Sequence, residues 1–118
     1  NELYIRPAQV VGIVISLLRH NSALDQRFIA DKLGLTQASW SRIENGNAVA
    51  NIEQIIYSCE VMGIDLVEFI KLYNLMCIEL NQELIIVTTD IKTPHSNSSE
   101  LKKYIKEILV NKAKQISL

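Results

Sequence analysis

The sequence contains few aromatic residues and no long apolar run. Aromatic residues make up 6% of the 118 positions and apolar residues 48%, so the core is expected to be mainly aliphatic. No stretch of 18 apolar residues occurs, which argues against a membrane-spanning helix. The apolar residues 10–18 are too few to span a bilayer, and they lack the cationic leader and cleavage site of a signal peptide. These absences predict a soluble cytoplasmic protein without a membrane partner.

Clusters of reactive side chains are also missing. Cys59 and Cys77 are the only cysteines, and their apolar neighbours favour buried, reduced thiols over a disulfide or a metal pair. His20 and His95 share no motif with them and are interpreted as ordinary surface histidines. The sequence shows no paired histidine and carboxylate, no glycine-rich phosphate loop and no metal cluster. We therefore expect no enzymatic activity, no cofactor and no bound metal.

Charge is nearly balanced over the whole chain but uneven along it. The net charge is −1, which by itself argues weakly against a nucleic-acid partner. Residues 1–50 carry a net charge of +1, residues 51–91 carry −6 and residues 92–118 carry +4. Because binding follows the local field more than the total charge, such a chain can still offer a nucleic acid a favourable face. The acidic middle would then point away from it, or pair with the basic tail of the same or another subunit.

Residues 24–46 form the clearest local pattern, two short helices joined by a tight turn. Asp25 and Thr36 can each accept an unpaired backbone N–H at a helix start. Gly34 stands where the first helix needs a positive φ to end, and Gly46 ends the second. Apolar residues recur at helical spacing in both helices: Phe28, Ile29, Leu33, Ala38, Trp40 and Ile43. This arrangement predicts a helix-turn-helix unit with Trp40 in the core, whose second helix can enter a DNA major groove.

A strongly apolar helix is predicted at residues 7–20, after a short leader at residues 1–6. Its inward stripe is expected to be Val11, Ile15 and Leu18. Further apolar residues fall on its other faces: Ile13, Val14 and Leu17. A helix that is apolar nearly all round is a buried helix. Either the C-terminal extension or a second subunit is therefore expected to cover it.

Two more helices are predicted to follow the central unit. Asn51 caps the first of them and forms a capping box with Gln54, and Gly63 ends it. Asp65 caps the second and forms a similar pair with Glu68. These signals are local, because each depends on side chains within three residues of a helix end.

The end of this second helix is ambiguous in the sequence. Its apolar spacing allows it to reach about residue 88, whereas the β-branched run at residues 84–89 predicts a break near Asn81 followed by a strand. A helix to at least residue 80 is favoured, and both alternatives stay open beyond it. Residues 92–99, with a proline and a run of serine and asparagine, are predicted to be a linker.

A last helix is predicted at residues 100–115. Its apolar face includes Leu101, Ile105 and Ile108, and its polar face includes Lys102, Lys103 and Lys106. Such a row of lysines is most often a solvated face. The alternative is a contact to DNA phosphate or to acidic residues of a partner subunit.

The central pattern resembles the Cro/repressor-type (Xre-like) helix-turn-helix DNA-binding family over about residues 8–70. The agreeing positions are Leu24, Gln26, Ile29, Ala30, Leu33, Gly34, Leu35, Thr36, Gln37, Trp40, Ser41, Ile43, Glu44 and Gly46. The chain departs from the family where Asp25 replaces Ser or Thr, where Ala50 replaces a frequent proline, and in its large Trp40. The resemblance implies an all-α fold, with a five-helix domain at residues 1–70 and a mainly helical C-terminal extension at residues 71–118.

The resemblance also implies a DNA-binding set, with a recognition helix at about residues 37–45. This set is Gln26, Thr36, Gln37, Ala38, Ser39, Ser41, Arg42, Asn45 and Asn47. Gln26 would bond a phosphate from its helix start. Gln37 and the two residues after it would face base edges, and Arg42 would reach a guanine or a phosphate. Asn45 and Asn47 are phosphate candidates, while Arg19 and Glu44 would form a structural ion pair.

The function implied by the resemblance is that of a sequence-specific transcriptional regulator, a repressor. It would act as a homodimer on a two-fold double-stranded DNA operator, with half-sites roughly 34 Å apart, in the cytoplasm and associated with the nucleoid. Apolar residues of the first, fifth and last helices would supply the dimer interface. One alternative is an antitoxin-type autorepressor whose residues 72–118 bind a toxin. Another is a protein-interaction module that lacks DNA affinity.

Overall fold

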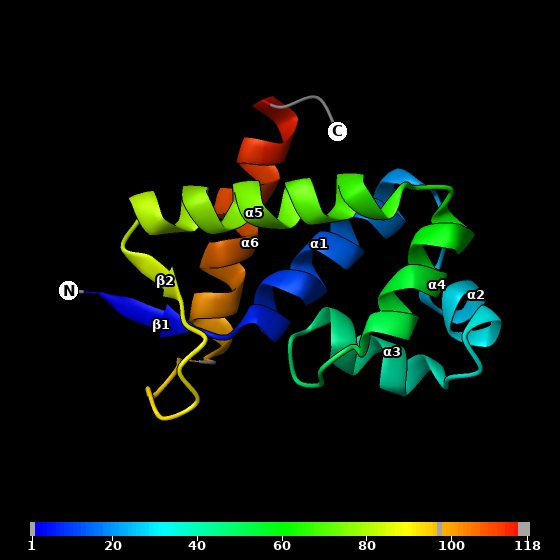
Figure 1. Ribbon diagram of the computed structural model, residues 1–118, viewed down its shortest axis with the longest axis horizontal. Helices are drawn as coiled ribbons and strands as arrows, with labels where there is room; N and C mark the ends of the chain where they lie inside the picture. The colour runs from blue at the N-terminus through cyan, green and yellow to red at the C-terminus, as the bar shows by residue number, and fades with distance from the viewer. Residues whose placement is uncertain (1, 97, 116–118) are drawn as a thin grey trace.

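The computed structural model describes residues 2–96 and 98–115, and it is mainly helical (Figure 1). The helices are α1 (Pro7–Asn21), α2 (Gln26–Lys32), α3 (Gln37–Glu44), α4 (Ile52–Met62), α5 (Leu66–Gln82) and α6 (Ser99–Gln115). Two short strands, β1 (Leu3–Ile5) and β2 (Ile85–Val87), form a parallel pair. The expected helical class is confirmed, with this small sheet added. Residues 1, 97 and 116–118 of the expected domain ranges lie outside the described residues, and the boundary at residue 70 falls inside α5.

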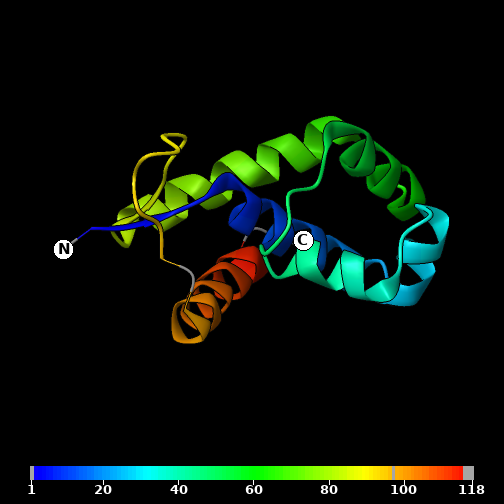
Figure 2. The ribbon, with the colours of Figure 1, turned by 90° about the horizontal axis from the view of Figure 1, so that it is seen from below.

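Helix α5 lies along the long axis of the molecule, with α2, α3 and α4 towards one end and the two strands at the other (Figure 1). In the view from below, α1 lies in the middle, with α5 on one side (Figure 2). Helices α3 and α6 lie on the opposite side of α1. The hydrogen bond from Lys102 to Asn47 places the start of α6 beside the end of α3. This arrangement puts a segment of the C-terminal extension next to the helix-turn-helix unit.

The helix starts follow the predicted capping chemistry. The backbone N–H of Phe28 donates to Asp25 Oδ1 at 2.8 Å, and that of Ser39 donates to Thr36 Oγ1 at 3.0 Å. Asn51 forms the predicted capping box of α4. Asp65 also caps α5, but the expected pair with Glu68 does not form. The Glu68 carboxylate instead lies 3.8 Å from Lys71, one turn further along the exposed face.

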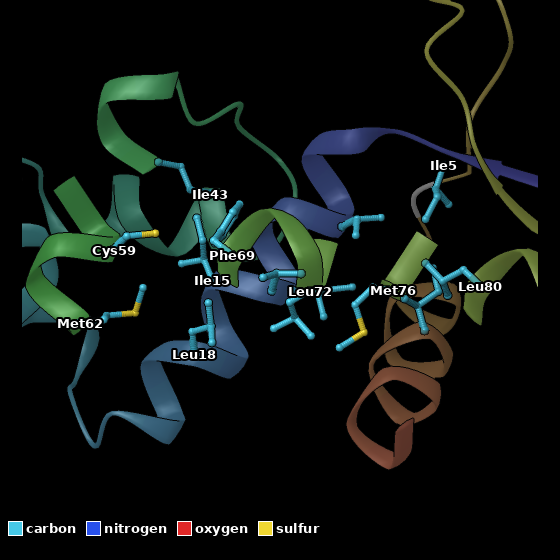
Figure 3. Close-up of a cluster of buried hydrophobic side chains, with 14 of the residues drawn as sticks. Ile5, Ile15, Leu18, Ile43, Cys59, Met62, Phe69, Leu72, Met76 and Leu80 are labelled. Atoms are coloured by element: carbon cyan, nitrogen blue, oxygen red, sulfur yellow. The ribbon is translucent and has the colours of Figure 1, made fainter. Parts of the chain in front are cut away.

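The core is a continuous apolar cluster along α5, running from α4 to β1 (Figure 3). Its largest fully buried side chains include Trp40, Phe69, Ile15, Met76 and Leu80. Cys59 is buried and Cys77 is half-buried, and both are free thiols. The prediction of a buried, free thiol is confirmed for Cys59, whereas Cys77 is free but only partly buried.

Helix α1 is buried within its own chain. Val10 and Val14 are fully buried, and Ile15 and Leu18 are buried as predicted. The predicted inward position of Val11 was wrong, because that side chain is only half-buried and the buried stripe is shifted by one residue. Helices α3, α4 and α5 pack against α1. No second subunit is needed to cover α1, so its apolar residues are not a free dimer surface.

The strand pair corrects the expectations for the start of the chain and for the segment after α5. The alternative of one helix to residue 88 was wrong, because α5 ends at Gln82 and Leu84 takes a positive φ of 59° that turns the chain into β2. Residues 3–5 are not a loose leader either, since they pair with β2 in parallel register. Ile5 and Ile85 are 0% and 1% exposed. Burial of these two side chains explains why such short strands persist.

The predicted linker is anchored to the start of α1. Arg6 donates from NH2 to the carbonyl of Ile91 at 2.9 Å and from Nε to His95 Nδ1 at 3.1 Å. The backbone N–H of Ser96 donates to the carbonyl of Tyr4 at 2.8 Å, and Gln9 Nε2 donates to the carbonyl of Ser96 at 3.1 Å. These bonds fix where α6 begins.

Candidate functional site

A buried ion pair holds α3 against α1. Arg19 Nε donates to Glu44 Oε2 at 2.6 Å, and Arg19 NH2 donates to Glu44 Oε1 at 3.0 Å. Arg19 NH1 also donates to the carbonyl of Leu24 at 2.9 Å, which ties the loop before α2 to the same pair. The side chains of Arg19 and Glu44 are only 9% and 4% exposed. A bidentate pair of this kind fixes the orientation of both helices, because its planar geometry allows little rotation.

Two further donors complete the environment of the Glu44 carboxylate. Trp40 Nε1 donates to Glu44 Oε2 at 2.6 Å, and Gln26 Nε2 donates to Glu44 Oε1 at 2.9 Å. Burial raises the pKa of Glu44. The hydrogen bonds from Arg19, Gln26 and Trp40 and the charge of Arg19 lower the pKa by more than burial raises it. The pKa of Glu44 therefore lies below its usual value, and the carboxylate stays ionised.

Gly12 is a residue of this junction that the sequence did not single out. A Cβ on Gly12 would stand 2.7 Å from the carbonyl oxygen of Glu44 and even closer to that of Ile43. Only glycine allows the backbones of α1 and α3 to approach this closely. An isolated glycine inside a strongly apolar helix was the available signal, because such a glycine usually has a packing reason.

The opposite face of α3 is open. Gln37, Ala38 and Arg42 are exposed, and Arg42 follows Ala38 by one helical turn. No hydrogen bond or ion pair to another residue in the described part of the chain engages the side chains of Gln37 or Arg42. These three predicted site residues therefore share one accessible surface, while the ion pair holds the helix from behind.

The remaining predicted residues of α3 are partly committed to local hydrogen bonds. The Thr36 hydroxyl donates to Ser39 Oγ at 3.0 Å, and Asn45 Nδ2 donates to Ser41 Oγ at 3.3 Å. Ser39 and Ser41 are half-buried, whereas Thr36 and Asn45 are exposed. The two serines thus lie at the edge of the open face rather than at its centre.

The end of α3 meets the start of α6. Lys102 Nζ donates to Asn47 Oδ1 at 2.9 Å. Between the two elements runs an open groove of about 820 Å³, with contributions from Gln9 and Ile13 of α1. Asn45, Asn47, Lys103 and Lys106 lie along it. The sequence predicted neither this groove nor the neighbourhood of α3 and α6, because the contact joins residues 55 positions apart.

The described residues contain neither a metal-binding cluster nor a membrane-spanning helix. Among them, no group of three or more His, Cys, Asp or Glu side chains is placed to hold a metal ion. No helix within the described ranges has both the length and the apolar character needed to cross a bilayer. The chemistry of the site consists of amides, hydroxyls, one guanidinium and nearby lysines, which can form hydrogen bonds and ion pairs with a polar partner.

A family model described as a helix-turn-helix domain matches residues 11–69, half of the chain. The match runs from α1 into the first turn of α5 and includes the whole open face of α3. No curated protein and no solved structure matches the chain significantly.

Proposed function

The chain belongs to the helix-turn-helix domain family, and on that premise we propose that it is a sequence-specific, DNA-binding transcriptional regulator. Helix α3 would lie in the major groove with Gln37 and Ala38 at base edges. Glutamine can bond an adenine through two hydrogen bonds, and an alanine methyl can pack on a thymine methyl. Arg42 would reach a guanine or the backbone one turn further along the helix.

The observation that carries this proposal is the division of α3 into a held face and an open face. Arg19, Trp40 and Gly12 secure one side of the helix. Gln37 and Arg42 remain accessible on the other. A recognition helix must be rigid in position while its reading side chains stay free, because misplacing those side chains loses the base contacts.

The phosphate role of Gln26 is compatible with its bond to Glu44. A glutamine amide nitrogen carries two N–H donors, and Glu44 accepts from only one of them. The second donor can bond a phosphate near the N-terminus of α2, where backbone N–H groups also favour an anion. Gln26 would then connect the backbone of the operator to the pair that positions α3.

We further propose that the protein acts as a homodimeric repressor on a two-fold operator. One domain contacts too few base pairs to specify a single site in a genome. A two-fold dimer doubles the number of base pairs that are contacted. Apolar side chains are exposed on α4 and the loop before it, where Val49 is 79%, Ile52 60% and Ile56 41% exposed. These residues are available for a dimer contact, in contrast to the apolar residues of α1.

The test is selection of bound duplexes from a random DNA pool by the full chain, with the mass of the complex measured by sedimentation. The expected product is a pair of inverted half-sites about one helical turn apart, bound by two protomers. Gln37→Ala should relax one position in each half-site, whereas Lys71→Gln on α5 should leave the selected sequence unchanged.

Two outcomes of this selection would contradict the proposal. Failure to enrich any sequence, with no dependence of binding on salt, would favour a protein-interaction module. The antitoxin-type alternative would be favoured if the chain purifies as a stable complex with a co-expressed second protein and if that protein releases the chain from DNA.

A further inference from the structure

The charge of the chain is divided between two segments of the sequence. Residues 51–91, which form α4, α5 and β2, carry a net charge of −6, and their exposed acids include Glu53, Glu60 and Glu68. Residues 92–118, which include α6, carry +4. Helices α3 and α6 lie on the side of α1 away from α5 (Figure 2). The first two turns of α6, which carry Lys102, Lys103 and Lys106, therefore lie next to the C-terminal end of α3.

The side chains at this junction form a continuous polar surface. Lys102 is bonded to Asn47, which follows the end of α3, so the first turn of α6 is fixed to the loop after the recognition helix. Lys103 and Lys106 are exposed along the same groove as Asn45. They lie three residues apart and hence on one face of α6. Their amines form a row that extends the surface of α3 rather than a closed pocket.

The apolar side of α6 keeps this row in place. Leu101 and Ile105 are 8% and 1% exposed within the core, and α6 packs against α5. The anchored segment before α6 fixes its start to Arg6 and Gln9. Helix α6 is thus held by its apolar face and by the segment before it. The lysines on it therefore have fixed positions in the folded protein, in contrast to the lysines of a flexible basic tail.

We propose that the first two turns of α6 are a second phosphate-binding surface, in which Lys103 and Lys106 contact the DNA backbone beside the segment engaged by the end of α3. This inference rests on the proposed DNA binding and adds to it contacts from outside the helix-turn-helix domain. Lysine contacts to phosphate carry no sequence information, so α6 would add affinity and orientation while α3 supplies specificity.

The experiment measures operator affinity of the full chain as a function of salt, using the sequence selected above. Each lost phosphate contact lowers the slope of log K against log salt by about 0.9. The double variant Lys103→Gln with Lys106→Gln should therefore reduce the magnitude of the slope by about 2 and weaken binding to all DNA sequences equally. Glu107→Lys, an exposed position on the same groove, should steepen the slope by about 1.

Lys114→Gln is the matched control, because Lys114 is an exposed lysine near the other end of α6. It should leave the slope unchanged, and circular dichroism should show that every variant retains the wild-type melting curve. A slope unaffected by the Lys103 and Lys106 changes would overturn the inference and leave the proposed function standing, provided that Arg42→Ala still weakens binding. Absence of any DNA binding by the wild type would overturn both.

The same variants also decide between DNA and a small phosphate-bearing ligand. Calorimetry with inorganic pyrophosphate provides the second measurement. If pyrophosphate binds the wild type but not the lysine variant, while the DNA slope stays the same for both, the groove is a small-ligand site and the inference is wrong.

Discussion

Gly12 of α1 faces the backbone of Glu44 in α3 so closely that a Cβ on Gly12 would stand 2.7 Å from the Glu44 carbonyl oxygen. Glu44 is also the residue whose side chain receives Arg19, Gln26 and Trp40. The same residue of α3 is thus held through its backbone by shape and through its carboxylate by hydrogen bonds. The position of α3 depends on both contacts.

Gly12→Ala is expected to destabilise the protein by about 1–3 kcal/mol, because the added methyl group forces α1 and α3 apart. Trp40, the single tryptophan, lies at this junction, so its fluorescence emission should shift in the folded variant. Chemical denaturation and emission spectra measure the two effects. Gly34→Ala is the control for backbone strain alone, since Gly34 has a φ of 70° but no atom within 4 Å of its Cβ position. An unchanged Trp40 emission in Gly12→Ala would contradict the steric explanation.

Glu44 should make stability depend on acid pH. Its pKa is lowered in the folded protein relative to the ordinary value of 4.5, so the stability that it contributes is fully present above pH 4.5. That contribution is lost as pH falls below 4.5 through the folded pKa. Glu44→Gln should remove this part of the pH dependence and cost about 3 kcal/mol at neutral pH, because Arg19 is left buried without its charge partner. Urea denaturation between pH 3 and 7 tests this, and parallel profiles for the two proteins would disprove it.

Arg42→Ala should weaken operator binding by about 1–3 kcal/mol if Arg42 reads a base, with little change in protein stability. The side chain is exposed, and no hydrogen bond or ion pair would be lost within the described part of the chain. Fluorescence anisotropy on the selected duplex measures the loss. Arg27→Ala, an exposed arginine of α2, is the matched control for general charge. Equal effects of the two substitutions on all sequences would remove Arg42 from the base-reading set.

The local parts of this fold could be predicted because their causes are local. Asp25, Thr36 and Asn51 cap helices through residues two or three positions away, and Trp40 sits on the inward side of a strong helical repeat. The placement of Leu3–Ile5 and of α6 could not be predicted. Three-residue strands carry little pattern of their own. The strand partner of Ile5 is Val87, 82 residues away, in a segment whose sequence also fits the end of a helix.

The same distinction between local and long-range causes applies to the candidate site. Helical spacing alone places Ala38 and Arg42 one turn apart on one exposed face. The position of Gln37 was expected from the resemblance to the family. The bond from Gln26 to Glu44 and the contact of Lys102 with Asn47 could not be predicted, because each depends on how two separate elements meet. Sequence patterns describe a helix face, but the neighbour that the face meets is set by packing of the whole chain.

Ile5→Ala should cost about 2–5 kcal/mol, because the side chain is fully buried at the strand pair. Leu3→Ala is the control from the same strand, since Leu3 is 42% exposed and should cost much less. Hydrogen exchange should also show weaker protection at the start of α6 in Ile5→Ala, as the anchored segment loosens. Equal stability of the two variants would show that β1 does not contribute to the core.

The two cysteines should react slowly in the folded protein. Burial raises the pKa of the Cys59 thiol, and the charge of Asp65 raises it further. Burial raises the pKa of Cys77, although a hydrogen bond with Tyr73 offsets part of this rise. Because the thiolate is the reactive form, iodoacetamide at pH 8 should modify neither at an appreciable rate until the protein unfolds. Rapid modification of Cys59 in native protein, followed by mass spectrometry, would contradict its burial.

The pairing of β1 with β2 imposes an order on folding. Arg6 and Ile91, which meet beside the two strands, are 85 residues apart in the chain. Once α1 packs against α5 the two strands are brought close together, because β1 directly precedes α1 and β2 directly follows α5. Helices α1 to α5 can assemble around Gly12 before this pairing, whereas α6 is placed only after it. A newly synthesised chain would therefore pack α3 against α1 before the lysines of α6 are in position.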